Sequence, residues 1–153
     1  MEINIKSDKY FMEKALQEAH KAFDADEVPV GAIITYENEI IARGHNYVEH
    51  LNDVTAHAEM QAFTSAADYI GGKYLNGCTL YVTLEPCIMC AAAISQARIR
   101  RLYFGADDLK YGSINGNINY FQKENTNHLP EIYDNICSES CNRLLINFFK
   151  ERR

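Results

Sequence analysis

Two short segments, thirty residues apart in the sequence, restrict the folds that this chain can adopt. They are His57-Ala58-Glu59 and Pro86-Cys87-Ile88-Met89-Cys90. Imidazole nitrogen and cysteine sulfur are ligands that Zn²⁺ prefers, and three of them leave the fourth tetrahedral position free for water. The fold must therefore bring one His and two Cys to a single point, with Glu59 close enough to exchange protons with that water.

The pattern of apolar residues predicts that helices and strands alternate along the chain. An apolar residue at every fourth position from Phe11 to Phe23 predicts a first helix with Ser7 as its N-cap. A second helix is predicted from near Thr55 to Gly71, and strands at 30–36, 39–43, 79–84, 101–104 and 131–136, with a loop over 106–119. A last helix presents an apolar stripe that consists of Cys141, Leu144, Leu145, Phe148 and Phe149.

Each of the two short segments is predicted to open a helix. His57 and Glu59 fall in the first turn of the second predicted helix. Pro86 occupies the first position of another, where its missing N–H costs nothing, so Cys87 and Cys90 share one face of that turn. The partial positive charge of a helix N-terminus favours thiolate over thiol at both cysteines.

Length and composition fit one domain with its own core, since the chain has 153 residues and 47% of them are hydrophobic. The order of elements predicts a three-layer α/β/α fold in which helices cover both faces of a mixed five-stranded sheet. The first residues lack the apolar core of a signal peptide, and no run of about 18 apolar residues occurs. We therefore expect a single domain over residues 1–153, in the cytoplasm and without membrane association, where five cysteines favour metal or redox chemistry over disulfides.

The net charge of −6 is unevenly distributed. Residues 1–97 carry 6 basic and 14 acidic side chains, whereas residues 98–153 carry 9 basic and 7 acidic ones. Because phosphate is bound by basic side chains, contacts with a nucleic acid are expected from Lys150, Arg152 and Arg153 at the end of the chain. On charge alone, a solubilising tail is the simpler interpretation of the same residues.

Two other interpretations compete with a catalytic zinc site. The Cys-x-x-Cys segment alone also fits a thioredoxin-like redox dithiol at a strand-to-helix junction. A structural zinc site would need a fourth ligand, which His45 or His50 could supply. The His-x-Glu segment has no role in a redox dithiol, and Glu59 would have none in a closed structural site, so the combination favours catalysis.

The sequence resembles the bacterial tRNA-specific adenosine deaminases of the cytidine deaminase-like zinc superfamily. The two short segments form the H-x-E…P-C-x-x-C pattern of zinc nucleobase deaminases. Other similar segments extend over most of the chain, at Val28–Ala32, Gly44–Asn46, Thr55–Glu59, Leu80–Cys87, Phe104–Ala106, Asn127–His128 and Phe148–Arg153. Asp107 and Tyr111 depart from this resemblance, because basic and small residues are expected in their loop.

The resemblance implies a cytidine deaminase-like fold and hydrolysis of adenosine to inosine at the wobble position of a tRNA anticodon. It implies that His57, Cys87 and Cys90 bind one Zn²⁺ per subunit, and that Glu59 is the catalytic acid and base. The implied partners are the tRNA anticodon stem-loop and a second copy of the chain in a homodimer. Substrate contacts are implied for Asn46 at the purine edge, Ala58, Asp108 beside the substrate backbone, Phe149 near flanking nucleotides, and Arg152 and Arg153 at phosphates.

Two points about the substrate follow from this interpretation. An acidic side chain at Asp108 would repel phosphate but accept a hydrogen bond from a 2′-OH, which favours RNA over DNA. The same zinc chemistry would also serve a deaminase of free guanine, cytosine or a nucleoside such as cytidine, which needs no basic tail. A thiol oxidoreductase is the alternative that uses the two cysteines alone.

Overall fold

The computed structural model of the chain describes residues 6–116, 118–122 and 128–152. One sheet has the strand order β2-β1-β3-β4-β5. Its strands are β1 (Gly31–Tyr36), β2 (Glu39–His45), β3 (Thr79–Leu84), β4 (Arg101–Ala106) and β5 (Glu131–Tyr133). β1 runs antiparallel to β2 and β3, whereas β3, β4 and β5 are parallel, so the predicted mixed five-stranded sheet is confirmed.

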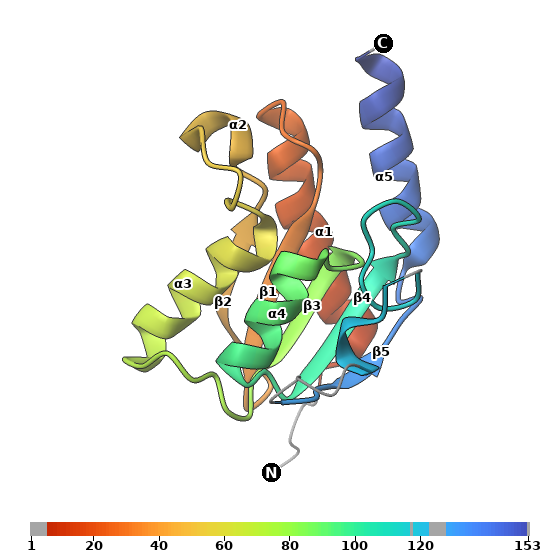
Figure 1. Cartoon of the computed structure of the whole chain (residues 1–153). Coiled ribbons are helices and arrows are strands. Elements are labelled where there is room, and N and C mark those ends of the chain that lie inside the picture. The colour runs from red at the N-terminus through yellow and green to blue at the C-terminus, as the bar shows by residue number, and fades with distance from the viewer. Residues whose placement is uncertain (1–5, 117, 123–127, 153) are drawn as a thin grey trace.

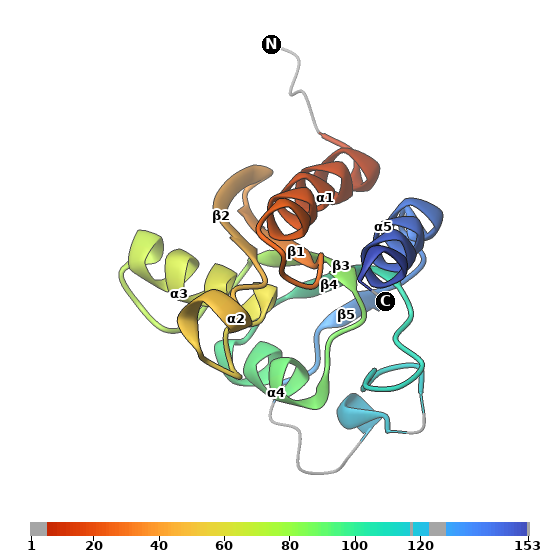
Figure 2. The ribbon, with the colours of Figure 1, turned by 90° about the horizontal axis from the view of Figure 1, so that it is seen from above.

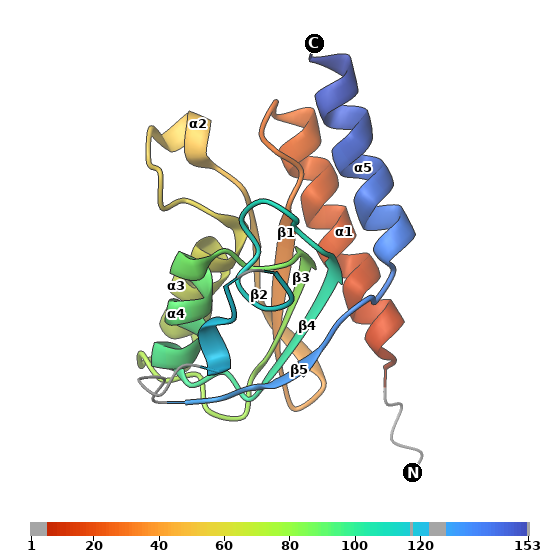
Figure 3. The same ribbon diagram turned by 45° about the vertical axis from the view of Figure 1, so that its right-hand side comes forward.

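Helices cover both faces of this sheet, as Figures 1, 2 and 3 show. α1 (Asp8–Asp24) and α5 (Ser138–Glu151) lie side by side on one face, and α3 (Ala58–Ile70) and α4 (Ile88–Ala97) lie on the other. The short helix α2 (Val48–Leu51) and the 3-10 helix η1 (Tyr120–Gln122) belong to connections. The three-layer α/β/α arrangement is therefore confirmed.

α1 follows its sequence pattern closely. The Ser7 hydroxyl accepts a hydrogen bond of 3.1 Å from the Tyr10 N–H, which satisfies one of the free N–H groups at the start of the helix. Phe11, Ala15 and Ala19 are buried against the sheet. The predicted N-cap and apolar face are confirmed.

Two glycines allow helices to approach the sheet closely from opposite faces. A Cβ atom at Gly31 would lie 2.0 Å from the Ala15 carbonyl oxygen of α1, and one at Gly44 would lie 2.5 Å from the Ala58 carbonyl oxygen of α3. Gly44 pairs with Ala32 in the sheet, one position along from the pairing of Gly31 with His45. The beginning of α3, which carries the His-x-Glu segment, therefore lies directly against the end of β2.

The two helices that carry the metal-binding segments begin later than predicted. α3 begins at Ala58 and α4 at Ile88, so His57 and Cys87 are N-cap residues with extended backbone. The Pro86 carbonyl accepts hydrogen bonds from the Ser113 N–H and hydroxyl, and the first carbonyl that bonds within α4 is that of Cys87. The Pro86 carbonyl therefore bonds to the loop at Ser113 and not within the helix, and α4 begins after Pro86 for this reason.

Other elements differ as well, and β2 and β4 each end two residues later than predicted. β5 ends at Tyr133, before the predicted residue 136, because Asn135 adopts a left-handed backbone with φ of 62° that interrupts the strand. α2 was not predicted, since four residues are too few to show a helical period.

The three cysteines outside the Cys-x-x-Cys segment differ in burial. Cys78 and Cys141 are buried and free, whereas Cys137 is half-buried at the N-cap of α5. Among the described residues, no helix combines the length and apolar character needed to cross a membrane.

Candidate active site

The starts of α3 and α4 bring the metal-binding residues together. His57 Nδ1 lies 3.6 Å from Cys87 Sγ and 3.7 Å from Cys90 Sγ. A tetrahedral zinc ion with typical bonds to nitrogen and sulfur would hold these atom pairs about 3.6 Å apart. All three ligand atoms lie within 4.8 Å of one another. The donor types and their spacing therefore fit zinc.

The electrostatics of the two thiols favour ionisation at one of them. A hydrogen bond from the Cys90 thiol and the adjacent His57 lower the pKa of Cys87 to about 4. The same hydrogen bond, together with burial, raises the pKa of Cys90. The hydrogen bond with Cys87 also raises the pKa of His57. A divalent cation at this point would ionise the second thiol as well, since a coordinating thiol loses its proton.

Glu59 lies in the first turn of α3 and is only 4% exposed. Burial raises the pKa of its carboxyl, and the negative charge of Cys87 adds to this effect. A carboxyl with a raised pKa holds a proton more readily, which suits a group that both accepts and returns a proton. Glu59 therefore has the environment of a proton-transfer group.

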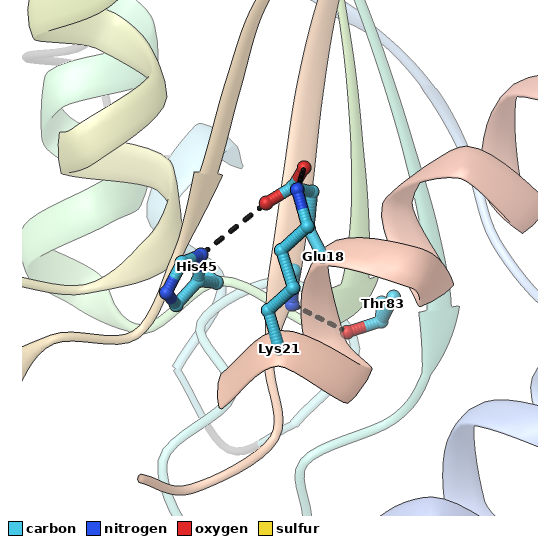
Figure 4. Close-up of polar contacts among 5 residues, drawn as sticks. Glu18, Lys21, His45 and Thr83 are labelled. Atoms are coloured by element: carbon cyan, nitrogen blue, oxygen red, sulfur yellow. Dashed lines mark hydrogen bonds and ion pairs between the residues drawn. The ribbon is translucent and has the colours of Figure 1, made fainter. Parts of the chain in front are cut away.

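Neither histidine that could have closed a structural zinc site is available for that role. His45 Nδ1 lies 3.2 Å from a Glu18 carboxylate oxygen, a contact that Figure 4 shows, and His50 Nδ1 lies 2.7 Å from a Glu27 carboxylate oxygen. In the part of the chain that the structure describes, the metal-ligand group consists of His57, Cys87 and Cys90 alone. The structural zinc alternative is therefore wrong for these two histidines.

A cleft of about 1540 Å³ opens beside the three ligands. This exceeds the range of about 300–1,000 Å³ that is typical of small-molecule pockets. The residues that line it come from the segments 25–30, 46, 48–50, 57–59, 84–88, 107–111 and 145–149, although not every residue of these segments takes part. The cleft therefore has space for groups on either side of a single base.

Asn46 lies on one wall of the cleft with an unpaired polar atom. Its side-chain oxygen is buried and has no hydrogen-bond partner among the described residues. Its backbone N–H donates to the Val30 carbonyl, and that of the next residue, Tyr47, donates to the Ala56 carbonyl. A buried acceptor without a partner is costly to a folded protein, so this oxygen is free to bind a ligand in the cleft.

Two buried carboxylates from α1 and the turn after it hold the segment around Asn46. Glu18 contacts His45 and also accepts a hydrogen bond of 2.8 Å from Lys21, as Figure 4 shows. Glu27 accepts hydrogen bonds from the Glu49 N–H at 3.0 Å and the His50 N–H at 2.9 Å, in addition to its contact with the His50 ring.

The environment of Glu27 favours its charged form. Burial raises the pKa of this carboxyl, but the hydrogen bonds from Glu49 and His50 outweigh burial and lower the pKa overall. Glu27 was not singled out from the sequence, because an acidic residue in a charged stretch is usually exposed.

A third buried carboxylate, Glu85, holds the opposite wall, which is the loop of residues 107–115. It accepts hydrogen bonds from the Asp108 N–H at 3.0 Å and from the Ile114 and Asn115 N–H groups, both at 2.9 Å. Asp108 itself accepts hydrogen bonds from the Lys110 and Tyr111 N–H groups. The only sequence signal for Glu85 was its place between a buried strand and Pro86.

The remaining residues implied by the resemblance occupy different environments. Ala58 is buried and lines the cleft, and Asp108 is another residue of the cleft lining. Phe149 is 51% exposed and lines the cleft, whereas its neighbour in the apolar stripe of α5, Phe148, is buried. Arg152 pairs with Asp26 and lies over the ring of Phe148 at 3.7 Å from the centroid. Arg153 lies outside the described residues.

The fold and the site together define a cytidine deaminase-like protein with a His-Cys-Cys set that fits zinc. The family model described as MafB19-like deaminase matches residues 6–153. The tRNA-specific adenosine deaminase of Agrobacterium fabrum is 46% identical over 144 residues, which are 94% of this chain and 95% of the relative. The chain belongs to the tRNA-specific adenosine deaminase family, which confirms the resemblance that its sequence indicated.

Two solved structures are similar at different levels. One comes from a study of A-to-I editing by tRNA:A34 deaminases at the wobble position of transfer RNA; it has a TM-score of 0.87 and 46% identity, and covers 89% of this chain and 99% of that one. The other is guanine deaminase from Bacillus subtilis, with a TM-score of 0.64 and 36% identity over 67% of this chain and 66% of that one. The first likeness is the more extensive.

Proposed function

We propose that this protein hydrolyses adenosine to inosine at the wobble position of a tRNA anticodon. The observation that carries the proposal is that His57, Cys87 and Cys90 come together near the buried Glu59, at a site where His57, Glu59 and Cys87 line the cleft. The near full-length similarity to tRNA-specific adenosine deaminases supports adenosine in tRNA as the substrate.

The proposed reaction uses one zinc ion per subunit and one proton-transfer group. Zinc held by His57, Cys87 and Cys90 would lower the pKa of water to about 7, and so supply a nucleophile at neutral pH. Glu59 would take one proton from the attacking water and deliver it to N1 of adenine as the water oxygen bonds to C6. It would then carry the remaining proton of that oxygen to the amino group, so that the C6–N bond breaks, ammonia leaves and the carbonyl of inosine forms. The raised pKa of Glu59 suits both transfers.

The two walls of the cleft are proposed to hold the target nucleotide. The unpaired side-chain oxygen of Asn46 accepts a hydrogen bond from the purine edge, while Ala58 packs against the base. The backbone N–H of Cys87, at the start of α4, steadies the oxygen that develops negative charge. Asp108 lies beside the substrate backbone, where it accepts from a 2′-OH.

Contacts outside the target base are proposed for the end of the chain. Phe149 packs on nucleotides beside the target, and Arg152 and Arg153 meet phosphates of the anticodon stem-loop. The Arg152 Nε–H group donates to Asp26, and the guanidinium has five N–H groups in all. Arg152 can therefore keep this ion pair and still donate to a phosphate. A base in an anticodon loop can be turned out at a cost of a few kcal/mol, which suits this cleft.

We further propose that residues 1–153 act as one domain and that two copies form a homodimer. The support for the dimer is the family resemblance. Light scattering during gel filtration measures the mass directly, and a stable monomer at working concentration would contradict this part of the proposal.

The second candidate is a deaminase of a free base, favoured by the similarity to guanine deaminase. To separate the two, the protein is incubated with unmodified total tRNA and, separately, with guanine, cytosine and nucleosides. Inosine at the wobble position without ammonia release from free bases supports the tRNA enzyme. Robust ammonia release from guanine or cytidine, with no change in tRNA, would contradict it.

Salt and the basic tail give a second test. Binding of tRNA should weaken with a log-log slope of about −0.7 for each phosphate contacted, whereas a free-base enzyme responds little to salt. Deletion of Lys150–Arg153 should weaken activity on tRNA and leave activity on a free base unchanged.

A further inference from the structure

Two large apolar side chains of the 107–115 loop lie in the cleft without being buried. Leu109 is 96% exposed and Tyr111 is 64% exposed, and both belong to the cleft lining. Large apolar groups that remain exposed within a binding cleft are available to a ligand. Tyr111 is also one of the two positions at which the sequence departs from the residues expected in this family.

The backbone beneath Tyr111 is fixed by local hydrogen bonds. The Asp108 carboxylate accepts from the Lys110 N–H at 3.1 Å and the Tyr111 N–H at 3.0 Å, and the Gly112 N–H donates to the Asp108 carbonyl at 3.0 Å. These bonds form a tight turn of the Asx type. The turn presents the side chains of Leu109 and Tyr111 in a defined direction before any ligand arrives.

Glu85 connects this turn to the segment that carries the metal-binding cysteines. Glu85 accepts a hydrogen bond from the Asp108 N–H, and a Cβ atom at Gly112 would lie 2.5 Å from a Glu85 carboxylate oxygen and 2.4 Å from the Asp108 carbonyl oxygen. Only glycine allows the loop to pass this close to Glu85. Because Glu85 lies two residues before Cys87, the position of Tyr111 is fixed relative to the reacting base.

The surroundings of Tyr111 favour a nucleotide over a purely apolar ligand. The Lys110 ammonium lies 5.0 Å from the centre of the Tyr111 ring, so a positive charge accompanies the aromatic face. Sites for single-stranded nucleic acids combine these two elements, since bases stack on aromatic rings and basic groups follow the phosphates.

We propose that Tyr111, with Leu109 beside it, forms a stacking surface for a nucleobase next to the target adenosine. Tyr111 is then a specificity-determining residue of this chain, and Lys110 binds the phosphate of the stacked nucleotide. This inference rests on the proposed function, because it assumes that the cleft holds an RNA segment longer than one nucleotide.

Fluorescence tests the contact without relying on turnover. The chain contains no tryptophan, so Tyr111→Trp introduces the only indole, and Glu59→Gln in the same protein prevents conversion of the RNA. Addition of an anticodon stem-loop with adenosine at the wobble position should quench the indole by stacking. The control is Tyr69→Trp in the same background, because Tyr69 is 69% exposed on α3 and is not part of the cleft lining. Equal responses of the two variants would overturn the proposal.

Kinetic measurements test how much the Tyr111 side chain contributes to the affinity for the RNA substrate. Tyr111→Ala should raise KM for the stem-loop by about 10-fold to 100-fold while kcat changes by less than about threefold, and Tyr111→Phe should retain most of the affinity. Leu109→Ala should have a smaller effect in the same direction. An unchanged KM for Tyr111→Ala would contradict the inference.

A substrate cycle identifies the nucleotide and separates the two proposals. Each base beside the wobble adenosine is replaced in turn by an abasic site, and the penalty of Tyr111→Ala should disappear for one of these substrates only. Persistence of the full penalty on every abasic substrate would overturn the stacking contact. If the wild-type protein does not form inosine in tRNA at all, the proposed function itself fails, which is a different result.

Discussion

The bottom of the cleft and its rim are held in place by different interactions. We use "floor" for His57, Glu59, Cys87 and Cys90, and "rim" for Leu109, Tyr111 and Phe149. The floor is built from the starts of two helices and is partly or fully buried, whereas the rim residues are at least 51% exposed. Rim positions in the 107–115 loop depend on backbone hydrogen bonds to the buried Glu85. In the proposed function, chemistry therefore depends on side chains of the floor, whereas substrate recognition depends on a loop whose backbone is held by a buried carboxylate.

The largest effect is expected from removal of a metal ligand in the floor. Cys90→Ala leaves two of the three ligands, so we expect loss of bound zinc and of all inosine formation. Metal analysis of the purified protein and an inosine assay on tRNA measure both. Cys78→Ala is the matched control, since Cys78 is equally buried but lies outside the site, and it should keep its zinc. Retention of zinc by Cys90→Ala would mean that the ligand set is wrong.

Removal of the proton-transfer group should leave the metal in place. Glu59→Gln keeps the shape of the side chain but cannot carry a proton, so kcat should fall by about 10²-fold to 10⁴-fold. Zinc content and far-ultraviolet circular dichroism should match the wild type. Full inosine-forming activity of this variant would exclude the proposed role of Glu59.

Glu27, which holds the wall around Asn46, should make a pH-dependent contribution to the free energy of unfolding. The pKa of Glu27 is lowered from 4.5 on folding, so its charged form stabilises the protein above this value, and the contribution is lost as pH falls through the folded-state pKa. Glu27→Gln should cost about 1–3 kcal/mol of unfolding free energy at about pH 6. Urea denaturation at descending pH should show the difference from wild type shrinking below pH 4.5. A difference that stays constant down to acid pH would contradict this role for the charge.

The smallest effect is expected at the outer edge of the cleft. Arg152 pairs with the exposed Asp26 and stacks on Phe148, so Arg152→Ala should cost less than about 1 kcal/mol of stability. If Arg152 also meets phosphate, KM for tRNA should rise several-fold and its salt dependence should decrease. Asp26→Ala is the control, because it breaks the same ion pair and keeps the guanidinium. An equal rise in KM for both variants would argue against a phosphate contact.

The sequence predicted the floor well because zinc chemistry dictates residue types and spacings. His57, Cys87 and Cys90 could be identified as a ligand set, and the alternating patterns predicted the five strands and the two faces of helices. The local geometry was less predictable. α3 begins about three residues later than predicted and α4 two residues later, and the second offset depends on a contact between Pro86 and Ser113, which are far apart in sequence.

The supports of the two walls could not be predicted from local patterns. Glu18, Glu27 and Glu85 are buried acids whose partners are backbone N–H groups or histidines up to 30 positions away. Single-sequence reasoning places such acids on the surface, because an ionised side chain is rarely buried unless it is paired. Only the tertiary structure reveals the pairing.

Glu85 holds the backbone of the 107–115 loop, so the side chains of this loop can change in evolution without disturbing the catalytic residues. Its three hydrogen bonds go to backbone N–H groups, and the side chains of Leu109, Lys110 and Tyr111 take no part in them. If these side chains contact neighbouring nucleotides as we propose, substitution at the three positions alters which neighbouring sequence the enzyme prefers, while the backbone of the loop and the zinc ligands keep their positions. The enzyme offers protein engineers three adjacent codons at which substrate preference can be diversified without rebuilding the reaction centre.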